Sequence, residues 1–164
     1  YYDKKGIREN KIVIFYYPDK KGRNHKLVEK VLYKLDSVNI KMIVLPYECK
    51  LESVNIEYPG RLIPQQLNEL YNTCKVGMVF SLTNPSRLGY EMLFSGLNVI
   101  EYDNEFTKYD LLSDYFTKIK DEKNIINIVY TLFNYKINSN LRDEFIRKHS
   151  NDNELEVFSK MFEN

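Results

Sequence analysis

The residues best suited to chemistry lie in one polar segment near the middle of the chain. It reads Ser81-Leu-Thr-Asn-Pro-Ser-Arg87 and follows the apolar run Val76 to Phe80. The segment leads into a predicted helix, and the free N–H groups and dipole at a helix start favour an anion such as phosphate. Arg87 adds a charge-assisted donor. The candidate phosphate ligands are Ser81, Asn84, Ser86 and Arg87.

Two residues in the helix after this segment extend the candidate site. Gly89 lies in the first helical turn, where the lack of a side chain would let a ligand approach the backbone closely. Glu91 lies further along the helix, and its carboxylate is suited to accept hydrogen bonds from a ribose diol. Simpler roles stay open at this point. From the residues alone, a helix cap is favoured for Ser86, and a solvated position near the helix dipole for Glu91.

A basic loop, Pro18 to Asn24, supplies the second half of the candidate site. It carries Lys20, Lys21 and Arg23 after the apolar run that precedes it. Cations here would face a diphosphate held by the polar segment, although a solvated basic loop is the simpler alternative. His25 begins the next helix, and a structural role is favoured for it over a catalytic one.

The pattern of apolar residues predicts the elements that position these loops. Continuous β-branched and aromatic runs indicate strands buried on both faces, at 11–17, 40–45, 76–80 and 98–102, with weaker ones at 54–57 and 115–119. Apolar residues at helical spacing indicate helices at 25–36, 64–71, 88–95, 121–135, 140–149 and 153–162. We expect Asn24 to cap the first helix and Gly96 to end the third.

Strands that alternate with helices predict a single α/β, Rossmann-like domain, with a parallel sheet covered by helices on both faces. In such a sheet, ligands bind outside the carboxyl ends of the strands, and both candidate loops leave strands at those ends. The chain begins at Tyr1 rather than Met, so we expect an excised domain. Residues 1–10 would be an extension or linker from a missing upstream domain, and 11–164 the folded domain.

Composition excludes several function classes. The 164 residues carry a net charge of +1 with both signs interspersed, which argues against nucleic-acid binding. No apolar run approaches the ~20 residues that a membrane-spanning helix needs. Cys49 and Cys74 lack metal-ligand spacing, and we expect free thiols. The two histidines are too few for a metal cluster, and no acidic pair suggests a metal site.

The order of the motifs resembles a known family. After the first strand comes Tyr-Pro-x-x-x-x-Arg-Asn, followed by Pro-Gly-Arg-Leu and a Gln-Gln-Leu-Asn-Glu-Leu-Tyr helix. Ser-Leu-Thr-Asn-Pro-Ser then leads to Gly-Tyr-Glu-Met-Leu-Phe-Ser-Gly-Leu-Asn-Val-Ile. Over residues 11–135 this resembles the carboxyl-terminal, donor-binding domain of GT-B glycosyltransferases of the family 4 type. It is especially similar to bacterial rhamnosyltransferases of surface polysaccharide synthesis.

The resemblance implies a role for each candidate residue. Glu91 matches the glutamate that binds the ribose of the nucleotide sugar, and Arg23 would face the diphosphate, so these two are the expected catalytic residues. Arg61 lies near the base. The remaining donor-site residues, facing the phosphates and the sugar, would be Ser81, Asn84, Ser86, Arg87 and Gly89. Further implications are a helical tail and no metal or other cofactor.

The resemblance also implies a reaction and its partners. A hexosyl unit would pass from a nucleoside diphosphate sugar to a glycan or lipid-linked glycan, held by an absent amino-terminal domain. Because nucleotide sugars are made in the cytoplasm, a cytoplasmic location follows, including the inner face of the membrane. No transmembrane segment is expected.

One departure from the family limits these implications. Many family 4 enzymes carry a second glutamate before the one at Glu91, at a position that falls on Thr83 here. That carboxylate usually touches the donor sugar, so the sugar and the stereochemical course stay open. A non-catalytic module is the alternative: a degenerate glycosyltransferase domain, or a receiver- or flavodoxin-like domain. A receiver should show an acidic cluster after the first strand, where this chain has Asp19 alone.

Overall fold

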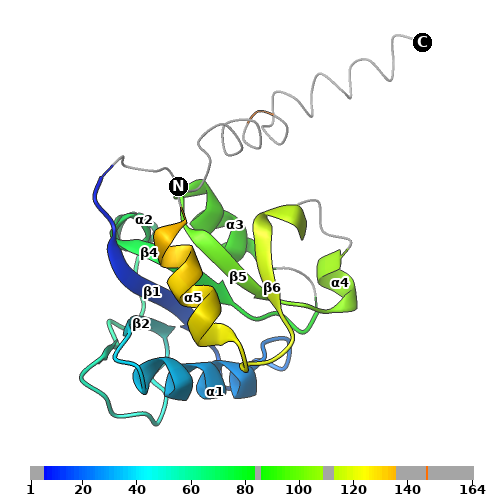
Figure 1. Cartoon of the computed structure of the whole chain (residues 1–164), viewed down its shortest axis with the longest axis horizontal. Helices are drawn as coiled ribbons and strands as arrows, with labels where there is room; N and C mark the ends of the chain where they lie inside the picture. Colours follow the sequence, from blue (N-terminus) through cyan, green and yellow to red (C-terminus); the bar gives the residue numbers. More distant parts are fainter. Residues whose placement is uncertain (1–5, 84–85, 109–112, 136–146, 148–164) are drawn as a thin grey trace.

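The computed structural model describes residues 6–83, 86–108, 113–135 and 147, and its centre is a six-stranded parallel sheet (Figure 1). The strands are β1 (Glu9–Tyr16), β2 (Lys41–Pro46), β3 (Ile56–Glu57), β4 (Cys74–Val79), β5 (Asn98–Tyr102) and β6 (Phe116–Ile119). Their order in the sheet is β3-β2-β1-β4-β5-β6, and every neighbouring pair is parallel. The strand order therefore reverses between β1 and β4, the position where such sheets bind ligands.

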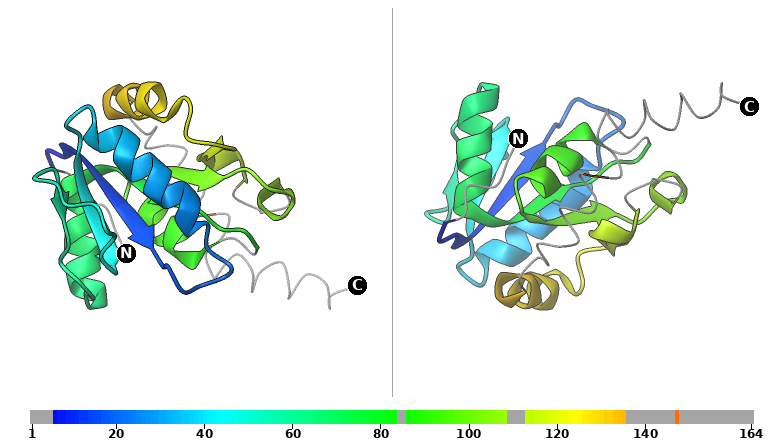
Figure 2. Two further views of the ribbon diagram at one scale, coloured as in Figure 1. Left: turned by 90° about the horizontal axis from the view of Figure 1, so that it is seen from below. Right: turned by 90° about the horizontal axis from the view of Figure 1, so that it is seen from above.

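Helices cover both faces of the sheet, as the sequence predicted. They are α1 (His25–Asp36), α2 (Pro64–Thr73), α3 (Arg87–Phe94), α4 (Glu105–Lys108) and α5 (Ile125–Asn134), with a 3₁₀ turn at Ser113–Tyr115. Figure 2 shows α1 and α5 on one face and α2 and α3 on the other. Successive residues of a strand point to opposite faces, so Ile12 and Ile14 pack in the α1 and α5 layer, and Val13 and Phe15 in the α2 and α3 layer.

Local signals set the ends of the helices that matter for the site. The Asn24 side chain accepts a hydrogen bond from Leu27 N at 3.3 Å at the start of α1. Ser86 does the same for Leu88 N at 3.3 Å at the start of α3. Gly96 follows α3 with φ +83°, a left-handed conformation that a glycine adopts without strain. These caps confirm the helix boundaries expected from Asn24, Ser86 and Gly96.

The structure differs from the sequence-based expectations in a few elements. β1 begins at Glu9, two residues before the expected strand, so part of the expected linker belongs to the folded unit. α5 begins at Ile125 rather than near 121, because the Asp121 carboxylate accepts from Lys123 N at 2.9 Å in a turn. α4 was not expected. The expected helices at 140–149 and 153–162 lie outside the described residues, apart from 147.

Arg8 joins the amino-terminal edge of the sheet to two helix ends. Its guanidinium donates to the carbonyls of Tyr71 and Cys74 at the end of α2, and to the Ser95 carbonyl at the end of α3. It also donates to the Asn72 side chain at 3.1 Å. A cation at two helix carboxyl ends satisfies carbonyls that have no partner within their helices.

No helix of the described residues is long and apolar enough to span a bilayer.

Candidate functional site

The two loops that the sequence marked as candidates lie against each other at the carboxyl edge of the sheet. Arg23 and Ser81 form an antiparallel bridge between them. Asn24 N donates to Phe80 O at 2.9 Å, and Leu82 N donates to Gly22 O at 3.0 Å. The two loops therefore form one backbone unit at the point where the strand order reverses.

The side chains of this unit are also connected. The Arg23 guanidinium donates to Ser81 Oγ at 2.6 Å. Asn104, which follows β5, donates from its side chain to Ser81 O at 2.6 Å. The structure thus brings together Arg23 and Ser81, two of the residues expected at the phosphate side of the site. Asn84, a third, lies outside the described residues.

A buried carboxylate lies beneath these loops, and the sequence reasoning missed it. Glu101, in β5, is 2% exposed. Its Oε1 accepts from Ser81 N at 2.8 Å and from Tyr102 N at 2.8 Å, and its Oε2 lies 3.4 Å from Ser81 Oγ. Burial raises the pKa of Glu101 to about 7, against the opposing effects of these hydrogen bonds and of the Arg23 charge. The available signal was a glutamate inside a strand, directly after the apolar pair Val99 and Ile100.

The start of α3 places Arg87 and Glu91 one turn apart. Arg87 Nε lies 3.5 Å from Glu91 Oε1; the Arg87 side chain is 91% exposed and that of Glu91 is 16% exposed. Ser86 is buried and caps the helix, as described above. The simpler role considered for Ser86 is therefore confirmed, and Glu91 is partly buried rather than fully solvated.

Gly89 has a packing role in this structure. A Cβ atom at Gly89 would lie 3.3 Å from the Phe116 ring and 3.4 Å from Val79. The position where a Cβ would stand therefore faces the sheet. Because Gly89 has no side chain, α3 can pack closely against β4 and β6. This packing accounts for the glycine without a ligand.

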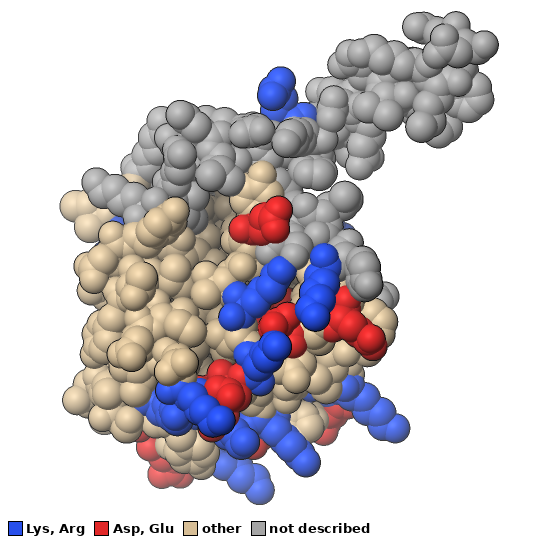
Figure 3. Space-filling view, turned by 45° about the vertical axis from the view of Figure 1, so that its right-hand side comes forward, with Lys and Arg blue, Asp and Glu red and all other residues tan. Residues whose placement is uncertain are grey.

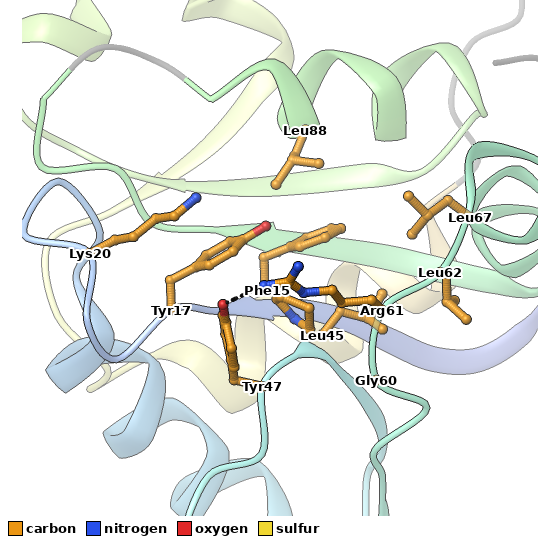
Figure 4. Close-up of a pocket in the computed structure, with 11 residues that line it drawn as sticks. Phe15, Tyr17, Lys20, Leu45, Tyr47, Gly60, Arg61, Leu62, Leu67 and Leu88 are labelled. Carbon is orange, nitrogen blue, oxygen red and sulfur yellow. Dashed lines mark hydrogen bonds between the residues drawn. The ribbon is translucent and has the colours of Figure 1, made fainter.

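An open cleft of about 400 Å³ lies beside the paired loops, at the carboxyl ends of β1 and β2 (Figure 4). Tyr17 and Tyr47 line it, together with Arg61 from the turn at Gly60, whose φ of +74° requires a residue tolerant of the left-handed region. Arg61 donates to the Tyr47 hydroxyl at 2.9 Å and lies 5.8 Å from the Tyr47 ring centroid. The rings, the cation and apolar side chains suit a flat aromatic ligand.

Tyr17 connects the cleft to the loops and to α3. Lys20 Nζ lies 4.3 Å from the Tyr17 ring centroid. Burial raises the pKa of the Tyr17 hydroxyl; Arg23 and Arg61 oppose the rise, while Tyr47 and Glu91 add to it. These four groups are therefore near enough to the Tyr17 hydroxyl to act on its ionisation. Of these groups, Arg61 and Tyr47 line the same cleft as Tyr17.

Other candidate chemistry is weaker. Within the described part of the chain, no cluster of three or more His, Cys, Asp or Glu side chains could hold a metal ion. Cys74 is buried and Cys49 half-buried, and both are free thiols, as expected. Lys and Arg are interspersed with Asp and Glu on the face shown in Figure 3.

Comparison with known proteins supports the fold. No family model matches the chain, and no curated protein matches its sequence. Among solved structures, the chain is similar to a GtfA/B complex, with 12% identity and a TM-score of 0.54 over 90% of this chain and 37% of that one. It is also similar to E. coli heptosyltransferase WaaC with ADP, with 9% identity and a TM-score of 0.49 over 86% of this chain and 44% of that one.

Both neighbours are glycosyltransferases of the GT-B fold. At this identity, the likeness to the GtfA/B structure establishes the fold alone: a Rossmann-like α/β layer structure consistent with half of a GT-B enzyme. The chain spans less than half the length of either neighbour.

Proposed function

We propose that this chain is the donor-binding half of a glycosyltransferase. It binds a nucleoside diphosphate sugar, and its full protein transfers the hexosyl unit to a glycan or lipid-linked glycan held by a second domain. The observation that carries the proposal is the pairing of the Arg23 and Ser81 loops at the carboxyl edge of the sheet, where the strand order reverses, next to the cleft lined by Tyr17, Tyr47 and Arg61.

Each part of the donor has a matching part of the site. The diphosphate lies at Arg23, the Ser81 loop and the amino end of α3, where cations and free N–H groups stabilise the charge of the leaving group. Glu91 accepts hydrogen bonds from the ribose hydroxyls, which replace its 3.5 Å contact with the exposed Arg87 side chain. The base enters the cleft between Tyr17, Tyr47 and Arg61. Holding the donor at three points orients the bond that breaks.

Finer features of the proposal come from the family resemblance. The enzyme is of the family 4 type, similar to rhamnosyltransferases of bacterial surface polysaccharide synthesis. It works without a metal or other cofactor, on the cytoplasmic side, including the inner face of the membrane. Asn84 and Arg87 complete the phosphate side. Transfer of rhamnose from dTDP-rhamnose by the full protein, with the product identified by mass spectrometry, tests the donor.

A second candidate, a nucleotide-binding domain without transfer activity, is favoured by one observation. Thr83 occupies the position where the family usually carries the carboxylate that touches the sugar, and its Oγ1 would lie 3.2 Å from a Cβ built on Gly22. The space beside Gly22 is thus partly filled by a neutral side chain. Binding of nucleotide combined with absence of any transfer by the full protein would favour this candidate.

Calorimetry with UDP, dTDP and GDP tests the donor site directly. We expect one of them to bind in the micromolar to millimolar range, and Glu91→Ala to weaken that nucleotide at least tenfold while the fold is kept. Glu57→Ala is the matched control, because it removes an exposed carboxylate from β3 instead. If none of the three nucleotides binds at millimolar concentration, the proposal is wrong.

A further inference from the structure

The donor contacts proposed above leave Glu101 unexplained. A buried, ionisable carboxyl costs stability unless it is paired and hydrogen-bonded. Glu101 is 2% exposed and has no ion pair within hydrogen-bonding distance among the described residues. It contacts Ser81, which in turn accepts from Arg23 at 2.6 Å. Glu101 is therefore placed to act on the phosphate side of the site without touching a ligand.

The charged groups around Glu101 come from each element that surrounds it. Arg23 comes from the loop after β1, and its charge favours the ionised carboxylate. Lys118 on β6 is the register partner of Glu101. Arg87 and Glu91 lie on α3, which packs on β5. Asp103 follows β5 and lies 3.6 Å from Lys120. Of these groups, Arg23 is the one whose charge is among the main influences on the pKa of Glu101.

We propose that Glu101 is a proton-linked positioning residue: it takes up a proton when an anion binds beside Arg23, which is linked to Glu101 through the Ser81 hydroxyl, and so couples donor affinity to pH. The inference rests on the proposed function, since the anion is taken to be the donor's diphosphate.

The hydrogen bonds give the first reason. When Glu101 is ionised, its Oε2 accepts the Ser81 hydroxyl hydrogen, at an O–O distance of 3.4 Å. When a proton from solvent joins Oε2, the new O–H donates to Ser81 Oγ instead. The Ser81 hydroxyl, which is 0% exposed, then no longer donates to Oε2, and its oxygen accepts from both Glu101 and Arg23, so the change at Glu101 reaches the Arg23 guanidinium through Ser81. Oε1 keeps its two N–H donors, Ser81 N and Tyr102 N, in both states.

Electrostatics acts in the same direction. A phosphate beside Arg23 adds negative charge near Glu101 and draws on the cation that favours ionised Glu101. Anion binding and protonation of Glu101 therefore assist each other, and by linkage each strengthens the other equally. Because the pKa of Glu101 is about 7, the coupling falls near neutral pH. If a bound anion raises that pKa by one unit, the protein with protonated Glu101 binds the anion about tenfold more tightly than the protein with ionised Glu101.

The coupling is measured first without a nucleotide. The titration of the Glu101 carboxyl carbon is followed by ¹³C NMR, with and without sulfate, whose charge does not change between pH 6 and pH 8. We expect a midpoint near 7 that rises in sulfate. Arg23→Gln should raise the midpoint in the absence of sulfate and remove the sulfate effect, and Ser81→Ala should reduce that effect. Asp103→Asn, the control on the same strand end, should leave it unchanged.

The second measurement uses the nucleoside diphosphate that binds, by calorimetry at pH 8 and pH 6. If binding raises the Glu101 pKa by one unit, the wild-type protein should bind about fivefold more tightly at pH 6 than at pH 8, once the pH dependence of Glu101→Gln is divided out. Binding should also take up protons from the buffer. The phosphate of the nucleotide titrates in the same range, but that contribution is common to both proteins and cancels. Amide NMR spectra check that Glu101→Gln is folded.

The outcomes separate this inference from the proposed function. If sulfate raises the Glu101 midpoint while no nucleotide binds, the proton-linked anion site stands and the donor function is wrong. If a nucleotide binds but neither it nor sulfate moves the midpoint, the donor function stands and the inference is overturned. A midpoint near the ordinary glutamate value of 4.5 also overturns it.

Discussion

Two arginines lie at opposite edges of the sheet and are held in different ways. Arg8, before β1, donates to three backbone carbonyls and one side-chain amide at the ends of α2 and α3. Arg23, after β1, donates to a single described side chain, that of Ser81. The Arg8 guanidinium has its donors directed at the protein, whereas the Arg23 guanidinium makes one hydrogen bond within the described part of the chain, to Ser81, and keeps further N–H donors available.

The difference separates a structural cation from the one proposed to bind the donor. An arginine whose hydrogen bonds all close within the fold stabilises the fold and has little left for a ligand. An arginine with one such bond contributes less to stability and keeps N–H donors that could bind a phosphate, as proposed for Arg23. Two further arginines belong to the candidate site. Arg61 has a hydrogen bond and a ring contact, both with Tyr47, and the exposed Arg87 has a 3.5 Å ion pair with Glu91.

Replacing Arg8 is expected to have the largest effect, and on stability. Arg8→Ala leaves carbonyls at the ends of α2 and α3 without their donor, which should lower the free energy of unfolding by about 3 kcal/mol. Urea denaturation measures it. Lys11→Ala is the control on the same strand, because its surface contact with Glu9 should contribute less than about 1 kcal/mol. Nucleotide affinity of the folded variant should be unchanged.

Arg23→Gln should show the reverse pattern. We expect stability to change by less than about 1 kcal/mol, because Glu101 can take up a proton when the cation is lost. Affinity for nucleotide and for inorganic pyrophosphate should both fall about thirtyfold, since a charge-assisted contact to phosphate is lost. Calorimetry measures both ligands. Equal stability losses for Arg8→Ala and Arg23→Gln would remove the distinction between the two arginines.

The sequence predicted the features of the fold and the site that depend on local patterns. Apolar periodicity located the strands and helices, and Asn24, Ser86 and Gly96 marked helix ends, because each of these signals acts within a few residues. The order of strand and helix also placed the Arg23 and Ser81 loops at the same edge of the sheet. Their contact follows from the topology, and the structure has it at 2.6 Å.

The parts that the sequence did not predict depend on contacts between distant residues. Arg8 lay in the expected linker, and nothing in its neighbours shows that carbonyls more than 60 residues away surround it. Glu101 lies within a strand, where alternation alone does not show whether a polar side chain meets solvent or a buried loop. Gly89 was expected to admit a ligand, but the residues it packs against, Val79 and Phe116, come from two other strands.

Arg61→Ala should weaken nucleotide binding by about three- to fivefold, the scale of an exposed cation–π or hydrogen-bond contact. It should leave pyrophosphate binding unchanged, because Arg61 lies in the cleft proposed for the base. Tyr47→Phe is the matched variant: it keeps the ring and removes the 2.9 Å hydrogen bond to Arg61. A loss of pyrophosphate affinity in Arg61→Ala would place Arg61 on the phosphate side with Arg23.

Arg87→Ala should have the smallest effect, because two contributions oppose each other. The variant removes a cation from the amino end of α3, which weakens phosphate binding, and it frees Glu91 from its 3.5 Å contact, which favours the ribose. With a side chain 91% exposed, each contribution is screened by solvent. We expect a net change in nucleotide affinity below about threefold.

Salt and a truncated ligand resolve these two contributions. Raising ionic strength shortens the range of the Arg87 charge, so any loss of nucleotide affinity in Arg87→Ala should shrink in high salt. Pyrophosphate, which lacks the ribose, should bind the variant less well than wild type, because the compensating gain at Glu91 is absent. Arg87→Ala could instead lower nucleotide affinity as much as Arg23→Gln does. In that case, the number of hydrogen bonds that an arginine makes within the protein does not decide which arginine binds the donor.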